Sequence, residues 1–435
     1  MAPEVVGLLA LAGLLALLAL RVPVGLSMVL VATCGQAVLV NGGAALARLG
    51  LDTFGIVSNA GLSVIPMFVL MGMSLARAHL GADLFRFTAA LLGNVRGALA
   101  MATIGASALF ASVSGSAVAT TLTMAVVTVP EMRRYRYDDR LSAPAAAVGG
   151  TLGLLLPPSG TLVLYGLLTQ ESIGRVLVAG ALPGVLTAAL LMLAAYLVAR
   201  RNPAWAPRLG RADGSLRRLP GLHTIWVVPA IFALSMGGLY LGVFTPTEAG
   251  AVGACLAVGF GLATRRLGWG GLCGAVAQTV RLCAALFLIL VGGTMFGYFL
   301  TLTRIPDGLA RFVAGLPLAP PLIVGVIFLI YFVMGALMEE IAILVIMTPI
   351  VYPVVTALGY DGVWFGVMSI MMLLTGLLTP PVGLLSFLTS SATGVPLGQV
   401  YRGVTPFWIT LILANALVIL FPQIALFLPQ LMRAR

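Results

Sequence analysis

The sequence predicts an all-α integral membrane protein with an inverted repeat, in which each half contributes one re-entrant helical hairpin and one broken transmembrane helix. The first observation is the composition, because 60% of the residues are hydrophobic and 9% are charged, whereas soluble domains are roughly half apolar and a quarter charged. The second is a repeated break. Residues 153–158 read GLLLPP and residues 376–381 read GLLTPP, 223 positions later, and adjacent prolines force a helix to unwind.

These breaks also predict a class of function. Unwound backbone inside a bilayer is tolerated only where it is buried in protein or lines a water-filled cavity. Two breaks in corresponding positions of two halves therefore point to the binding site of a secondary transporter. No GxxxxGK[ST] phosphate loop occurs, which argues against ATP hydrolysis by this chain. An intramembrane enzyme is disfavoured, because the chain has only His79 and His223 and neither an HExxH nor a GxSxG motif.

Apolar segments of suitable length predict the helices in the membrane. Ten of them, the two broken ones included, lie near residues 5–20, 24–40, 63–78, 144–168, 176–199, 223–243, 247–264, 275–300, 363–392 and 404–430. Two others, 98–131 and 318–356, are too long for one span and too short for two. Each has a polar or irregular middle, Ser112–Ser116 in one and Gly335–Glu340 in the other. We interpret both as re-entrant hairpins.

The basic residues predict the orientation. All 24 are arginines. If the N-terminus lies outside, seventeen arginines fall in inner loops, six fall in outer loops and Arg281 lies within a span, as the positive-inside rule requires. This topology opens the first hairpin to the cytoplasm and the second to the far side, and it explains the net charge of +11 better than nucleic-acid binding does. Glu4 precedes the first apolar stretch without a basic region, so we expect a retained span and no signal peptide.

The repeat extends beyond the double prolines. Two further pairs share the 223-residue offset, Val129-Pro130 with Tyr352-Pro353 and Tyr137-Asp138 with Tyr360-Asp361. Each half thus consists of a connector, a hairpin, a broken helix and a full span. The connectors, residues 77–97 and 303–315, carry mixed charges on an apolar background and are expected to lie along the membrane surface. The predicted divisions are 1–76 (N-terminal scaffold helices), 77–199 (first repeat), 200–300 (a cytoplasmic linker over 200–223, then scaffold helices) and 301–430 (second repeat).

The cysteines predict neither a disulfide nor a metal site. Cys34, Cys255, Cys273 and Cys283 lie in or beside apolar spans, and no CxxC pair occurs. We expect free thiols buried among apolar side chains.

The first hairpin and the first break together offer uncharged oxygen ligands. Hydroxyls and flexible backbone gather at the hairpin tip in Ser112, Ser114, Gly115, Ser116, Thr120 and Thr121. The broken helix supplies Gly153, Pro157, Pro158, Ser159 and Thr161. Hydroxyls and carbonyls freed by a helix break suit a sodium ion. The alternative is that these hydroxyls pack helices and bond to backbone carbonyls.

The second hairpin adds carboxylates, Glu339 and Glu340, at its tip. A carboxylate at membrane depth costs several kcal/mol, so it is paired, solvated or bound to a cation. We expect a cation ligand or a proton carrier. Because adjacent helical residues point about 100° apart, only one of the two should face the ion, and we favour Glu339, which corresponds to Ser116. The matching break supplies Gly376, Thr379, Pro380, Pro381 and Gly383. Glu248, which follows a proline, is expected instead to cap a helix.

The chain resembles the large membrane subunit, of the DctM or SiaM type, of tripartite ATP-independent periplasmic (TRAP) transporters. The resemblance spans nearly the whole chain in the family's order. In the first half it rests on Ser114–Thr120, Val129–Met132, Leu156–Ser159 and Thr245–Ala249. In the second half it rests on Met338–Glu340, Thr348–Ile350 and Leu378–Leu384.

The resemblance implies an elevator-type, sodium-driven symporter of an organic acid in the bacterial inner membrane. Its implied partners are a periplasmic substrate-binding protein and a separate small membrane subunit with four helices, and it implies no cofactor beyond the coupling sodium ions. The first implied sodium site comprises Ser114, Gly115, Ser116, Gly153, Pro157 and Ser159. The second comprises Glu339, Gly376, Thr379, Pro380 and Gly383. The residues expected to face the substrate are Ser116, Thr120, Ser159, Glu340 and Thr379.

Two alternatives stay open on the sequence alone. A stand-alone dicarboxylate or oxyanion symporter or antiporter would share the repeat but need no binding protein. The second alternative is a membrane scaffold protein, but a scaffold role does not explain the repeated helix breaks or the acidic hairpin tip. The residues do not select among sialic acid, C4-dicarboxylates, keto acids and aromatic acids as substrates.

Overall fold

The computed structural model describes residues 2–20, 22–207, 226–305, 308, 311 and 319–433. Within these ranges the chain is helical and contains no strand. The N-terminal helices are α1 (Pro3–Ala19), α2 (Val24–Leu39), α3 (Gly42–Val57), η1 (Ala60–Ser63) and α4 (Val64–Arg77). Three more follow the first repeat, α12 (Val227–Tyr240), α13 (Pro246–Ala263) and α14 (Trp269–Thr303). We call α1–α4 and α12–α14 the non-repeat helices.

The two repeats follow the same order of elements. The first contains α5 (Leu80–Leu92), α6 (Ala98–Ser114), α7 (Ala117–Arg134), α8 (Asp139–Thr151), η2 (Leu152–Leu154), α9 (Gly160–Thr169) and α10 (Ile173–Arg201). The second contains α16 (Pro320–Gly335), α17 (Glu340–Ala357), α18 (Gly362–Gly376), α19 (Leu384–Thr393), α20 (Leu397–Leu420) and α21 (Gln423–Arg433). Helices α7 and α17 each have 18 residues and begin 223 positions apart. The predicted hairpins, α6–α7 and α16–α17, and the predicted broken helices, α8–α9 and α18–α19, are thereby confirmed.

The repeated Tyr-Asp dipeptide has a structural reason. Asp138 caps the N-terminus of α8 by accepting a hydrogen bond from the Arg140 backbone N–H at 2.8 Å. Asp361 caps α18 in the same way, accepting from Val363 at 2.8 Å and Trp364 at 3.1 Å. A carboxylate at this position satisfies backbone donors that a helix leaves free. The motif therefore marks where the broken helix of each repeat begins.

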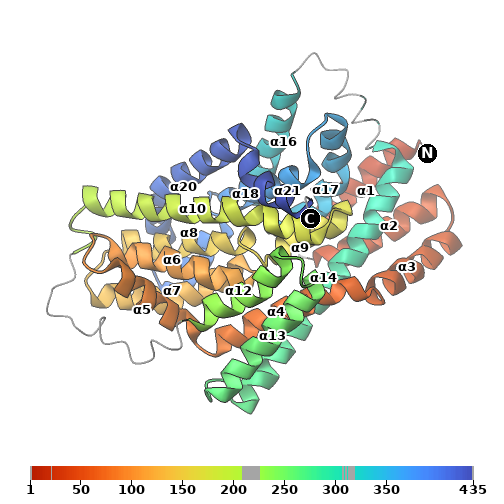
Figure 1. The fold of residues 1–435 in the computed structure, drawn as a ribbon. Coiled ribbons are helices and arrows are strands. Elements are labelled where there is room, and N and C mark those ends of the chain that lie inside the picture. The colour runs from red at the N-terminus through yellow and green to blue at the C-terminus, as the bar shows by residue number, and fades with distance from the viewer. Residues whose placement is uncertain are drawn as a thin grey trace.

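The non-repeat helices pack along one side of both hairpins. Helix α14 runs beside α2 and α4 and also contacts α9 and α17, while α4 contacts α6 and α13. Figure 1 shows α1, α2 and α3 grouped at one end of the molecule and α5, α6, α7 and α8 at the other. At 35 residues, α14 is roughly 52 Å long, which exceeds the roughly 30 Å hydrocarbon core of a bilayer. Such a helix must tilt or extend beyond the membrane.

Several expectations are corrected. Helix α3 was not expected, because Arg48 and Asp52 lower the hydropathy of its segment; they form an ion pair of 2.8 Å one turn apart. The expected span 404–430 is two helices, since the chain leaves the helix at Phe421 before Pro422. Three thiols expected to be buried, those of Cys34, Cys255 and Cys273, are exposed on outward helix faces; all four cysteines are free and Cys283 is buried.

Other expectations are supported or lie outside the described residues. Glu248 forms a capping box with Thr245, whose backbone N–H donates to the carboxylate at 2.8 Å. Six helical segments among the described residues are long and apolar enough to cross a membrane, namely Ala60–Arg77, Ile173–Arg201, Pro246–Ala263, Trp269–Thr303, Glu340–Ala357 and Leu397–Leu420. Most of the predicted linker, 208–223, and most of the second connector, 306–307, 309–310 and 312–315, lie outside the described residues.

Candidate functional site

The tip of the first hairpin is a two-residue turn held by its own hydroxyls. Gly115 ends α6 with φ of 60°, a left-handed backbone conformation that favours glycine. Ser116 caps α7 by accepting from the Ala119 N–H at 3.3 Å. The Thr120 hydroxyl donates to the Ser116 carbonyl at 2.7 Å, and it lies 2.7 Å from the Ser114 hydroxyl. The hydroxyls of Ser114, Ser116 and Thr120 therefore stabilise the turn at the hairpin tip.

The first break is held by Ser159 in a similar way. The Ser159 hydroxyl donates to the Leu154 carbonyl at 2.5 Å and accepts from the Leu162 N–H at 3.3 Å, so it bridges the two halves of the broken helix. Because Ser159 caps α9, the backbone donors of this helix's first turn face the break. The side chain is fully buried.

The hairpin tip and the first break touch through their backbones. The Gly160 N–H donates to the Gly115 carbonyl at 3.1 Å. A Cβ on Gly153 would lie 2.5 Å from the Ser116 carbonyl oxygen, and a Cβ on Gly115 would collide with the Pro158 carbonyl. Only glycine permits this approach at both positions. The structure therefore brings together Ser114, Gly115, Ser116, Gly153 and Ser159, as the sequence proposed; their role as ion ligands stays a prediction.

One cavity of about 240 Å³ adjoins this contact. The first hairpin and first break contribute Ser114, Gly115, Ser116, Pro158, Ser159, Gly160, Thr161 and Val163. The tip of the second hairpin contributes Glu339, Glu340 and Ile341. Two non-repeat helices close it with apolar side chains, Ile65, Phe68, Val69 and Met73 from α4 and Leu282, Ala285, Leu286 and Ile289 from α14. The cavity thus lies where both hairpin tips meet the non-repeat helices.

The two glutamates differ in their surroundings. Glu339 is the extended residue before α17 and is exposed; it also lines a neighbouring space between α2, α14 and α17. Glu340 begins α17 and is only 5% exposed, and its Oε2 has no hydrogen-bond partner among the described residues. Both residues line the cavity. The expectation that only one of the two glutamates would lie at the site is therefore not supported.

The second break lies apart from this cavity. Gly376 packs against the end of α16, where an added Cβ would meet the Phe332 carbonyl oxygen at 2.5 Å. The Thr379 hydroxyl donates to the Thr375 carbonyl at 2.8 Å and accepts from the Trp408 indole at 2.8 Å. None of Gly376, Thr379, Pro380 and Gly383 lines the cavity. Thr120 and Pro157 do not line it either, and Thr120 is fully buried within the first hairpin.

Sequence reasoning missed the wall made by α4 and α14. Its residues, such as Phe68 and Leu286, are apolar residues within apolar spans, and nothing in their type distinguishes a cavity wall from a lipid-facing or core position. Their helical spacing is a weak indication that they form one wall, since one face of α4 presents Ile65, Phe68, Val69 and Met73.

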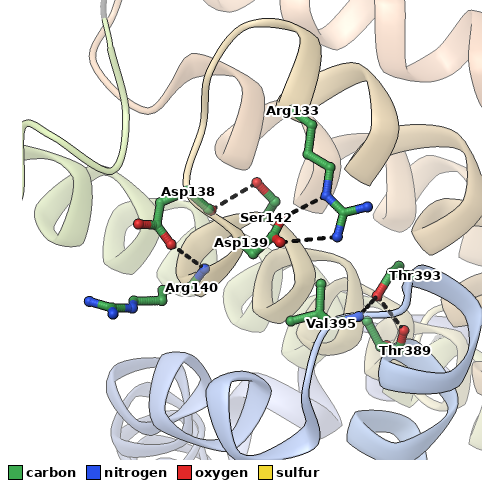
Figure 2. Close-up of polar contacts among 8 residues, drawn as sticks. All are labelled: Arg133, Asp138, Asp139, Arg140, Ser142, Thr389, Thr393 and Val395. Atoms are coloured by element: carbon green, nitrogen blue, oxygen red, sulfur yellow. Dashed lines mark hydrogen bonds and ion pairs between the residues drawn. The ribbon is translucent and has the colours of Figure 1, made fainter.

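A second polar cluster lies at the turn between α7 and α8. Figure 2 shows Arg133 pointing at Asp139, which accepts from it at 2.8 and 3.0 Å, and Asp138 accepting from the Arg140 backbone. Beside it lies the end of α19 with Thr393 and Val395. The Arg133 and Asp139 side chains are half-exposed, and their bonds close the turn, so they position α8 rather than form part of the cavity.

Comparison with known proteins identifies the family. A profile described as the tripartite ATP-independent periplasmic transporter, DctM component, matches residues 11–424. The chain belongs to this family. The sialic acid TRAP transporter large permease protein SiaM of Vibrio cholerae is 32% identical to this DctM component over 421 residues, 96% of this chain and 97% of SiaM. The C4-dicarboxylate TRAP transporter large permease protein DctM of Pseudomonas aeruginosa is 34% identical over 85% of this chain and 86% of its own.

A solved structure shares the fold of this DctM component. The YdaH transporter of Alcanivorax borkumensis superposes with a TM-score of 0.64 and covers 96% of this chain and 98% of its own, at 16% identity. This likeness concerns the fold alone. The family itself makes the chain a multi-pass membrane component of a transporter, and not an enzyme.

Proposed function

We propose that this DctM component carries an organic acid across the bacterial inner membrane in symport with sodium. The observation that supports the proposal is the shared cavity, in which the first hairpin tip, the first break and two glutamates of the second tip converge. Backbone at a helix break supplies carbonyl oxygens for sodium, and helix N-termini favour an anion. Ser116 and Ser159, which cap α7 and α9 beside the cavity, mark two such N-termini.

The mechanism follows from these contacts. A sodium ion at the contact between the first tip and the first break would fix the turn at Gly115 against Pro158, and so set the N-termini of α7 and α9 towards the substrate. A second ion at Glu339 would offset the negative charge that this carboxylate brings to the cavity. The hairpins and broken helices would then move together against α4 and α14, as an elevator, and expose the cavity on the other side. The N-terminus would be periplasmic.

The proposed partners are a small membrane subunit with four helices and a periplasmic substrate-binding protein. Family membership gives a component of a tripartite system, and the exposed apolar faces of α1–α3, with Leu8, Leu46 and Phe54 among them, suit lipid or another membrane helix. Omitting either partner from reconstituted vesicles should abolish uptake. Full uptake by this chain alone would instead favour a stand-alone symporter.

Reconstituted uptake tests the sodium coupling. The complete system in proteoliposomes should accumulate the substrate of its binding protein only with an inward sodium gradient. Replacing sodium by choline at equal ionic strength is the control. Uptake that is unchanged without sodium would overturn the proposal.

A carboxamide at Glu339 tests the second ion. We expect Glu339→Gln to fold, because the residue is exposed and its side chain makes no capping bond, but to need about tenfold more sodium for half-maximal uptake, a loss of about 1.4 kcal/mol. A sodium dependence equal to that of the unmodified protein would place the ion elsewhere.

A further inference from the structure

The cavity has an uneven distribution of charge. Its lining contains two carboxylates, and none of the described lining residues is basic. The other polar groups are hydroxyls, and those of Ser114, Ser116 and Ser159 already bond within the first tip and first break. A substrate whose only charges were carboxylates would therefore bring negative charge beside Glu340 with no cationic side chain to offset it.

One oxygen of the Glu340 carboxylate is left without a hydrogen-bond partner among the described residues. The residue is 5% exposed, and the oxygen without a donor is Oε2. A buried carboxylate oxygen left without a donor is costly, so such groups are paired with a cation or a donor when the site is in use. Glu340 is one of the residues that line the cavity, so a ligand bound there would lie beside it.

The chemistry at Glu340 suits a cationic N–H donor, because a carboxylate presents only acceptor atoms when it is ionised. Glu340 is the first residue of α17, where the backbone presents N–H groups and the carbonyls point away along the helix. Sodium sites in broken helices draw on freed carbonyls, and the break that contacts the first tip brings Pro158 to another wall of the cavity. A charged amine or amidine instead needs carboxylate acceptors, which this tip provides.

A second wall suits the opposite charge. Helix α9 has ten residues and begins at Gly160. In its first turn the N–H groups of Gly160 and Leu162 already bond to Gly115 and Ser159, so Thr161, which lines the cavity, is the residue positioned to bind a ligand. The N-terminus of a helix attracts a carboxylate. The cavity of about 240 Å³ is below the roughly 300–1,000 Å³ of sites for drug-sized ligands. A compact ligand therefore fits it.

We propose that the transported acid is a compact zwitterion, whose cationic nitrogen binds Glu340 at the tip of the second hairpin and whose carboxylate binds the start of α9. This inference rests on the proposed function and names its substrate class. Glu340 is then a specificity-determining residue, because it makes the carrier prefer an acid that also bears an ammonium or amidinium group.

Matched ligands of one skeleton test the proposal. The purified complex of this chain with its small subunit is heated in sodium buffer with 4-aminobutyrate, butyrate or glutarate, and with other amino acids paired with their amine-free analogues. At least one amine-bearing acid should raise the unfolding temperature at a concentration about tenfold or more below that of its amine-free partners. Equal or stronger stabilisation by the amine-free acids, or none by any amine-bearing acid, would overturn the proposal.

Glu340→Gln tests the residue. The variant should lose the preference for amine-bearing ligands, and Glu131→Gln, a matched change at a half-exposed residue of α7 paired weakly with Arg134 at 4.0 Å, should keep it. A preference that survives Glu340→Gln would overturn the role of Glu340, and the ligand comparison on the unmodified protein decides the substrate class even if the variant does not fold. Stabilisation by sodium without ligand is recorded in parallel. If the unmodified protein responds to sodium but shows no preference for amine-bearing acids, this inference fails while the proposed sodium coupling stands.

Discussion

Ser159 makes two hydrogen bonds that together define the first break. Its hydroxyl holds the end of the 3-10 turn through Leu154 and the start of α9 through Leu162. The sequence marked this residue as an ion ligand, and the structure gives its hydroxyl a capping role beside the cavity. The two roles are compatible, because a serine oxygen has two lone pairs and one donor hydrogen.

Ser159→Ala should therefore have two effects. Loss of an N-cap costs about 1 kcal/mol of stability, and loosening of the break should raise the sodium concentration that gives half-maximal thermal stabilisation. Thermal unfolding of the purified protein across a sodium series measures both. Ser58→Ala, which removes an exposed hydroxyl bonded to the Phe54 carbonyl, is the control. If Ser159→Ala needs the same sodium concentration as the unmodified protein, the first break does not contribute to sodium binding.

Individual site residues were predictable where their type is unusual for a membrane. The serine-rich tip and Glu339-Glu340 stand out because hydroxyls and carboxylates at that depth need a reason. The apolar wall of α4 and α14 does not stand out, and the choice between the two glutamates required the burial of Glu340. Residue type locates a polar site, but it does not reveal which apolar side chains enclose it.

The repeated elements were the most predictable level of structure. Double prolines, capping aspartates and the 223-residue offset each have a local physical cause, so they appear directly in the sequence. The two repeats differ, however, in the side chains that they bury. Tyr331, Thr348 and Ser369 are buried hydroxyls in the second repeat, and the corresponding positions of the first repeat, Ala108, Ala125 and Ala146, are all alanines. These differences in side-chain type lie outside the repeated motifs, so the repeat alone does not predict them.

The contact between hairpin and break can be tested at Gly153. An added Cβ would lie 2.5 Å from the Ser116 carbonyl oxygen and 2.8 Å from the Ala117 nitrogen, both backbone atoms. Overpacking of this kind costs about 1–3 kcal/mol, so Gly153→Ala should lower the unfolding temperature and uptake together. Gly259→Ala in α13, where a Cβ meets nothing within 4 Å, should be neutral or slightly stabilising. Equal behaviour of the two variants would show that the contact is not needed.

At the scale of the molecule, the repeats and the non-repeat helices meet at one surface. Helix α14 contacts both α9 and α17, and α4 contacts α6 and α9, so the cavity between them would change if the repeats moved. Among the described residues, hydropathy, the double prolines and the polar hairpin tips predicted the order of the spans, hairpins and broken helices, but not α3 or the division of α20 from α21. The surface itself could not be predicted, because it joins segments far apart in the sequence.

A reversible crosslink across this surface tests the central claim, that the hairpins carry the substrate by moving against α14, most directly. A Cβ on Gly293 of α14 would lie 4.0 Å from the Cβ of Val345 in α17, within the range of about 3.5–4.5 Å found in disulfides. In a chain without its four native cysteines, Gly293→Cys with Val345→Cys should stop sodium-driven uptake when oxidised and recover it when reduced, while the uptake of each single-cysteine variant should not respond to oxidation. Full uptake with the crosslink complete would contradict the account.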